Sequence, residues 1–211
     1  MSHKWLKFEC LLLFAAFPLT LALLKPHSWI YITLWLVALL AWRVLQKEGY
    51  TLRGEWNWKA LDAAVFKHIL RRFVPIALLL LLFTWFVVPD RLFSLPLERP
   101  TVWVMVMLLY PLLSGIPQEV VFRSYFFRRY APLFSTPRAM MIASACAFGW
   151  VHIVLLNWVA VVFSAIAGLF FADTYARTKS LAAVCFEHAL YGCFIFTIGL
   201  GVYFYHGQAV R

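Results

Sequence analysis

The sequence predicts an all-α, polytopic transmembrane helical bundle, and two observations support that fold class. Of its 211 residues, 64% are hydrophobic and only 13% are charged, with a mean hydropathy of +0.81. The apolar residues gather in seven long runs, whereas most Lys and Arg residues fall between these runs, as membrane topology requires. We therefore expect one integral membrane domain over residues 1–211, with about seven spans and no soluble domain.

The predicted spans follow one another along the chain with short connections. They cover residues 8–24, 28–45, 73–88, 101–128, 138–156, 158–175 and 180–205. Within the basic connection 43–72, one set of apolar residues recurs at helical spacing: Trp58, Leu61, Val65 and Ile69. This pattern predicts one interfacial amphipathic helix on the membrane surface. The fifth and sixth spans carry small residues that permit close helix packing, among them Gly149, Ala165 and Gly168.

The net charge of +10 raises the question of a nucleic-acid partner. The distribution of the charge argues against one, because the basic residues lie in short segments between apolar runs. With a cytoplasmic N-terminus, fifteen Lys and Arg residues lie in inside segments and four in outside segments. This split predicts an N-terminus in the cytoplasm, and we expect the protein to reside in a bacterial inner membrane.

Residues 114–123 interrupt an apolar run with polar and charged side chains. A charged side chain at bilayer depth costs ~2.5–3.5 kcal/mol on insertion scales, so such residues usually serve a function. Glu119 and Arg123 are four residues apart and share one helix face. Pro117 removes one helical hydrogen bond from the same segment. The rest of the chain is then a scaffold that brings other polar groups to this face.

Two later spans carry intramembrane histidines, His152 and His188. At ~1.5 Å per residue, Glu119 and His188 lie ~14 Å and His152 ~21 Å from the inner boundary. Helix tilt can close that difference, so we expect the three side chains to line one cavity in the cytoplasmic half. Glu187 points about 100° away from His188 on its helix. Glu187 and Asn157 therefore have either a supporting role at the site or a purely structural one.

These residues resemble the pattern of the CAAX prenyl endopeptidase and bacteriocin-processing (Abi) family of intramembrane proteases. That pattern is Glu-Glu-x-x-x-Arg, then Phe-x-x-x-His, then His-x-x-x-Asn or Asp, on separate helices. The corresponding residues in this chain are Gln118, Glu119, Arg123, Phe148, His152, His188 and Gly192. The resemblance covers residues 101–207 and implies a family-like catalytic core there.

Two positions depart from the family pattern. The resemblance implies that the first Glu activates water, and this chain has Gln118 there. It also implies an Asn or Asp that helps to hold the oxyanion, and this chain has Gly192. An amide cannot take a proton from water as a general base. The candidates to replace the missing oxyanion donor are Tyr191, Asn157 and Glu187, and those to replace the base are Glu119 and Glu187.

The leading hypothesis is hydrolysis of a peptide bond in a membrane-associated or lipidated peptide. Glu119, polarised against His152, would deprotonate a water molecule, and His188 would donate a hydrogen bond to the oxyanion. Arg123 would position Glu119 or a substrate carboxylate. Two histidines and a glutamate can also hold Zn²⁺. The sequence lacks HExxH, however, and the resemblance favours a reaction without a metal or other cofactor.

Two other functions use the same residues. The amide at Gln118 and the absent side chain at Gly192 indicate, as the alternative, a catalytically silent scaffold or bacteriocin-immunity protein of the same family. A transporter would also bury polar groups, but the sequence shows no inverted repeat. The partners expected for either family function are membrane lipid and a membrane-associated peptide or protein.

Overall fold

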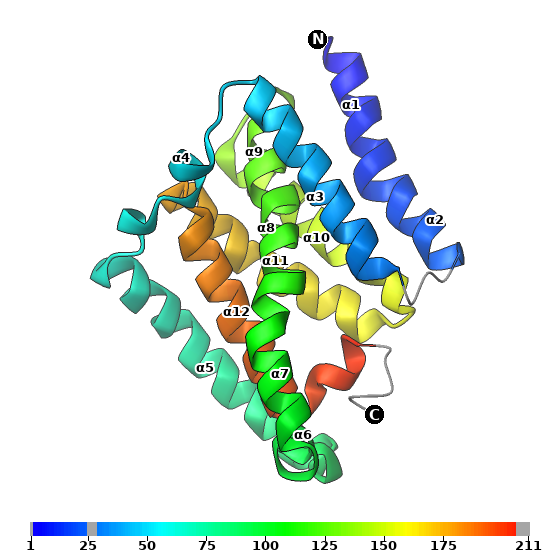
Figure 1. Cartoon of the computed structure of the whole chain (residues 1–211), viewed down its shortest axis with the longest axis vertical. Coiled ribbons are helices and arrows are strands. Elements are labelled where there is room, and N and C mark those ends of the chain that lie inside the picture. The colour runs from blue at the N-terminus through cyan, green and yellow to red at the C-terminus, as the bar shows by residue number, and fades with distance from the viewer. Residues whose placement is uncertain (1, 25–28, 206–211) are drawn as a thin grey trace.

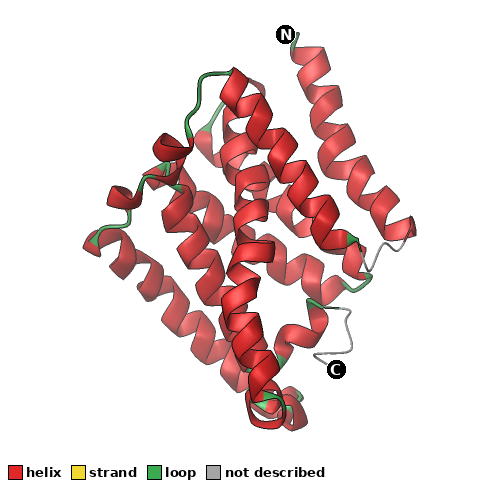
Figure 2. Cartoon of the chain, viewed as in Figure 1, coloured by secondary structure: helices red, strands yellow, loops and turns green. Residues whose placement is uncertain are grey.

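The structure, a computed structural model, describes residues 2–24 and 29–205 and confirms the all-α class (Figure 2). Every regular element within those residues is a helix. Among the described residues, six helices are long and apolar enough to cross a membrane: His3–Leu24, Ile30–Lys47, Ala63–Val87, Pro100–Arg129, Pro137–Leu155 and Trp158–Thr178. The protein is therefore an integral membrane protein. The predicted boundary at Ser28 and the end of the family-like region at Gly207 lie outside the described residues.

The seventh predicted span, α12 (Leu181–Thr197), is shorter than the other six. Its 17 residues rise ~25 Å at ~1.5 Å per residue, against a hydrocarbon core ~30 Å thick. The helix packs against α5 (Ala63–Val87), α7 (Pro100–Tyr110) and α11 (Trp158–Thr178), so it lies inside the bundle (Figure 1). An inner helix of this kind can carry polar side chains without exposing them to lipid.

The first two spans lie towards one edge of the bundle (Figure 1), where the first packs on the fifth span and its final turn and the second packs on the fourth span. The first consists of α1 (His3–Leu11), a π-helical segment (Leu12–Ala16) and α2 (Phe17–Leu24), and the second is α3 (Ile30–Lys47). Glu9 in α1 accepts hydrogen bonds from Tyr125, Tyr130 and Arg129 at the end of the fourth span. These bonds fix the first span against the fourth.

The position predicted for the surface helix is wrong. The structure has a short α4 (Leu52–Trp56) and a 3₁₀ turn (Trp58–Ala60), and α5 begins at Ala63, ten residues earlier than the predicted third span. Asp62 supplies the start signal, because its Oδ1 accepts a hydrogen bond from the Val65 amide at 2.8 Å. The apolar stripe of the connection continues in helical phase into the third span, and Ile69 is fully buried. The amphipathic pattern therefore belongs to the first turns of a spanning helix.

The fourth span is a helix interrupted by wider turns. A π-helical segment (Pro111–Gly115) follows α7, and a second one (Val120–Tyr125) separates α8 (Ile116–Glu119) from α9 (Phe126–Arg129). Pro111 and Pro117 lack the amide proton that a regular helix needs at these points, so the turns widen. The widened turns lie where the span carries its polar and charged residues. Glu119 and Arg123 are both buried there.

The fifth and sixth spans pack closely through their small residues, as predicted. α10 (Pro137–Val151) ends in a 3₁₀ turn (His152–Leu155), and Asn157 caps α11 by accepting a hydrogen bond from the Ala160 amide. A Cβ at Gly149 would lie 2.5 Å from Ala165 Cβ, and one at Gly168 would lie 3.1 Å from Ala145 Cα. Only glycine permits this approach, which brings His152 at the end of α10 towards α12.

Candidate active site

Glu119 lies at the centre of a buried charged cluster. Its Oε1 is 2.7 Å from His188 Nδ1, and its Oε2 is 3.2 Å from Arg123 Nε. The contact with Arg123 is an ion pair without hydrogen-bond geometry. Glu119 and Arg123 are completely buried, and His188 is 4% exposed. The predicted ion pair one helical turn apart is thus present, and His188 rather than His152 binds the carboxylate.

Arg123 is held from several sides. Its NH1 donates to Ser144 Oγ at 2.9 Å, and its guanidinium lies 4.9 Å from the centre of the Phe148 ring. Its NH2 donates more weakly to the Gly168 carbonyl at 3.4 Å. A buried ion pair of this kind adds little net stability, but removing one partner leaves an uncompensated charge and costs ~3–5 kcal/mol. Arg123 therefore neutralises Glu119 and fixes its position.

His188 connects this cluster to Tyr110. Its Nε2 lies 2.9 Å from the Tyr110 hydroxyl, and the Phe171 ring stacks on the imidazole with a centroid distance of 4.7 Å. Because a carboxylate only accepts hydrogen bonds, Nδ1 of His188 donates to Glu119. The result is a chain of three polar side chains from Glu119 through His188 to Tyr110.

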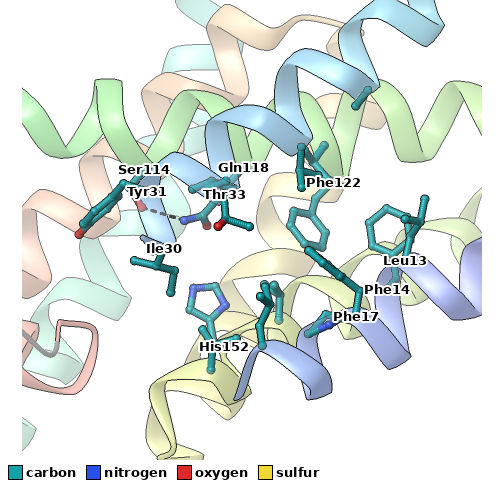
Figure 3. Close-up of a pocket in the computed structure, with 18 of the residues that line it drawn as sticks. Leu13, Phe14, Phe17, Ile30, Tyr31, Thr33, Ser114, Gln118, Phe122 and His152 are labelled. Atoms are coloured by element: carbon teal, nitrogen blue, oxygen red, sulfur yellow. Dashed lines mark hydrogen bonds between the residues drawn. The ribbon is translucent and has the colours of Figure 1, made fainter. Parts of the chain in front are cut away.

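A cavity of about 790 Å³ lies between the first, second and fourth spans and the end of α10 (Figure 3). Most of the side chains on its walls are apolar. Gln118 and His152 point into it from different elements, and Tyr110 and Ser114 also line it. Glu119 is not among the lining residues. The structure therefore places Gln118, and not Glu119, on the same cavity as His152.

The polar end of this large cavity has one free acceptor on each side. Gln118 donates through Nε2 to Ser114 Oγ at 2.7 Å, and its buried Oε1 has no hydrogen-bond partner. His152 donates through Nδ1 to the Phe148 carbonyl at 2.7 Å. In the neutral imidazole, Nε2 of His152 is then an acceptor. His152 Nε2 can bind a water molecule here, whereas Gln118 Oε1 is shielded from solvent and can do so only after the amide turns towards the cavity.

A second, small cavity of about 50 Å³ lies against the large one and shares Tyr110, His152 and Phe204 with it. His188, Tyr191 and Gly192 also line this small cavity. Both predicted histidines therefore reach one space, although Glu119 lies behind His188. A cavity of this size has room for one or two water molecules, although most of its walls are apolar.

Glu187 and Asn157 lie outside both cavities. Glu187 is bound by Arg72 at 2.8 Å and by Thr174 at 2.5 Å, and Arg72 also contacts Asp173 at 2.8 Å. Asn157 caps α11 and donates to the Tyr203 carbonyl at 2.8 Å. Their polar atoms are thus used in helix packing and capping. Among the described residues, no group of three or more His, Cys, Asp or Glu side chains is placed to hold a metal ion.

Tyr110 is the residue of this site that the sequence did not indicate. It lies in an apolar run, 78 residues before His188, and no spacing rule connects the two positions. Its contact with Gly192, the position that departs from the family pattern, became visible only in the structure.

The structure thus gathers a glutamate, an arginine and two histidines inside a bundle of membrane-spanning helices. The chain belongs to the type II CAAX prenyl endopeptidase Rce1-like family, whose model matches residues 100–205, about half of the chain. At the level of the family, it is a CAAX-type intramembrane protease, which confirms the resemblance seen in the motifs. No curated protein matches the chain, and no solved structure does.

Proposed function

We propose that this protein is an endopeptidase that hydrolyses a peptide bond in a membrane-associated or lipidated peptide. The observation that carries the proposal is the large cavity, which is mostly apolar and has Gln118 and His152 on its wall. Its volume of about 790 Å³ is typical of a ligand site. An acyl or prenyl chain that enters from water would gain ~0.8 kcal/mol for each CH₂ group buried there, whereas one that enters from the bilayer would gain much less. The peptide end of such a substrate would then lie at the polar groups.

The hydrolytic water would bind to His152 Nε2 and, once the Gln118 amide has turned towards the cavity, would donate a hydrogen bond from one O–H group to Gln118 Oε1. His152 would take the other proton as the water oxygen adds to the carbonyl carbon, forming a tetrahedral intermediate. The same proton would pass to the amide nitrogen as the C–N bond breaks, leaving a carboxylic acid and an amine. This sequence of proton transfers uses Nε2 of His152 as the acceptor. Nε2 is free because Nδ1–H donates to the Phe148 carbonyl.

In this proposal Glu119 is not the base that deprotonates the water. Both its oxygens face His188 and Arg123, and the side chain is completely buried. Its role is to orient His188, because it accepts the hydrogen bond from Nδ1 of that ring. Arg123 keeps the carboxylate in place and has no cavity contact.

Substrate selection would come largely from the N-terminal helices. The family match begins at Pro100, so α1, α2 and α3 lie outside it. These helices supply much of the apolar wall, including Phe14, Phe17 and Tyr31. The apolar chain of the substrate would therefore contact the part of the protein that the family model does not match.

The test is hydrolysis of a fluorogenic peptide library in nanodiscs, with each peptide in lipidated and unlipidated form. We expect wild type to cleave lipidated members and His152→Ala to lose at least ~10²-fold in rate, the usual contribution of a general base. His68→Ala is the matched control, because His68 pairs with Asp173 and lines neither cavity. If the folded wild type cleaves no member of the library, the proposal fails and the catalytically silent scaffold replaces it.

A further inference from the structure

Tyr110 and Gly192 fit together sterically. Tyr110 ends α7, and its ring lies directly against Gly192 in α12. A Cβ at position 192 would overlap Cε1, Cζ and the hydroxyl oxygen of the tyrosine. The ring therefore fills the space that a side chain at position 192 would need. Tyr110 can occupy its observed position only because residue 192 is a glycine.

The hydrogen-bonded chain from Glu119 determines what the Tyr110 hydroxyl can do. Glu119 accepts from His188 Nδ1 at 2.7 Å, and His188 Nε2 lies 2.9 Å from the Tyr110 oxygen. When Nε2 also carries a proton, it donates to that oxygen, and the hydroxyl proton is free to bind a third group. The Phe171 ring, stacked on His188 at 4.7 Å, keeps the imidazole in this plane. With both nitrogens of His188 protonated, these hydrogen-bonded side chains present the Tyr110 hydroxyl as a donor at their open end; with neutral His188 the hydroxyl donates to Nε2 instead.

That open end lies on the substrate side of the site. Tyr110 lines both the large and the small cavity, and His152 does so too. A peptide carbonyl placed beside His152 for attack by water therefore lies against the wall that carries Tyr110. Of the other donors considered for this place, Asn157 and Glu187 are bound elsewhere. The Tyr191 hydroxyl is buried without a partner, and its residue lines only the small cavity.

We propose that the Tyr110 hydroxyl donates the hydrogen bond that stabilises the substrate carbonyl oxygen as negative charge develops on it. His188 and Glu119 act through Tyr110 as positioning residues. The inference rests on the proposed function, since it needs a peptide carbonyl in the large cavity. A donor aimed at developing charge in a site that excludes water contributes ~10²–10³-fold to kcat.

The kinetic test uses Tyr110→Phe, which keeps the ring against Gly192 and removes only the hydroxyl. We expect kcat to fall ~10²–10³-fold, the range for loss of one oxyanion donor, while KM changes less than about threefold. Tyr203→Phe is the matched control, because Tyr203 lines neither cavity, and it should leave both constants unchanged. A rise in KM at constant kcat for Tyr110→Phe overturns the inference.

A second measurement does not need turnover. A lipopeptide whose scissile amide is replaced by a ¹³C-labelled ketone is bound to the protein in nanodiscs, and its carbonyl stretch is recorded by infrared difference spectroscopy. We expect a lower frequency in wild type and Tyr203→Phe than in Tyr110→Phe. Equal frequencies in the three proteins overturn the inference and leave the proposed function intact. A Tyr110-dependent shift without any cleavage supports the inference and removes only the hydrolytic function, whereas absence of ketone binding overturns both.

Discussion

Replacing Gln118 by glutamate places a carboxylate on the wall of the large cavity opposite His152. The two side chains have nearly the same shape, so the substitution changes charge and hydrogen bonding more than packing. The Gln118 amide now donates to Ser114 Oγ at 2.7 Å, and its Oε1 has no partner. In Gln118→Glu the Ser114 hydroxyl can turn and donate to the carboxylate instead. The other carboxylate oxygen faces the cavity as a base that the amide cannot be.

The expected gain in rate follows from that base. General-base catalysis contributes ~10²–10⁴-fold, and His152 already supplies part of it in the proposed mechanism. We therefore expect Gln118→Glu to raise kcat by about tenfold to a hundredfold, below the full contribution. The substitution also adds negative charge next to Glu119, which is the carboxylate that pairs with Arg123. Gln118 is only half-buried, so the cost of the new charge is ~1–3 kcal/mol of stability, near that of an unpaired polar group.

The assay compares wild type, Gln118→Glu and Gln46→Glu for cleavage of the best lipidated peptide in nanodiscs and for thermal unfolding. Gln46 is exposed on α3 and lines neither cavity, so Gln46→Glu controls for the added charge. We expect only Gln118→Glu to combine a higher kcat with a Tm lowered by several degrees. A folded Gln118→Glu that has lost the activity of wild type refutes the reasoning, because the water would then depend on the amide itself.

Three further predictions concern the charged cluster, the buried carboxylate of α4 and the topology. Glu119→Gln should lower kcat ~10²-fold by releasing His188, and it should lower the free energy of unfolding by ~3–5 kcal/mol, because buried Arg123 loses its charge partner. Glu55→Ala should lower the free energy of unfolding by ~3 kcal/mol in thermal or denaturant unfolding, because Glu55 is 2% exposed and pairs with Arg128. Cysteines introduced at positions 2 and 208 should react with impermeant label from opposite sides of the membrane, with position 2 in the cytoplasm.

Each of these predictions has an outcome that contradicts it. If kcat is unchanged in Glu119→Gln, the Glu119 carboxylate does not contribute to the reaction and has a purely structural role. Glu98→Ala is the control for Glu55→Ala, since Glu98 is exposed, and equal unfolding of the two variants counts against the buried network. Labelling of both termini from the same side means that the 17-residue α12 does not complete a seventh crossing.

The sequence by itself determined the features that depend on local spacing. Runs of apolar residues can be located along the sequence without any structure. The helical membrane class and most span positions therefore followed from hydropathy alone. The Glu119–Arg123 pair followed from a separation of four residues, which places both side chains on one face of any helix. The close packing at Gly149 followed in the same way, because small residues are the only ones that let two helix backbones meet.

The tertiary structure decided which wall each polar side chain faces. The rotation of the fourth span depends on the π-helical segments on either side of α8, and α8 directs Gln118 to the cavity and Glu119 to His188. Sequence spacing cannot supply that rotation, because it is set by packing against helices far away in the chain. The contact between Tyr110 and His188 is of the same kind. It joins residues 78 positions apart, and it exists only because position 192 in the neighbouring helix has no side chain.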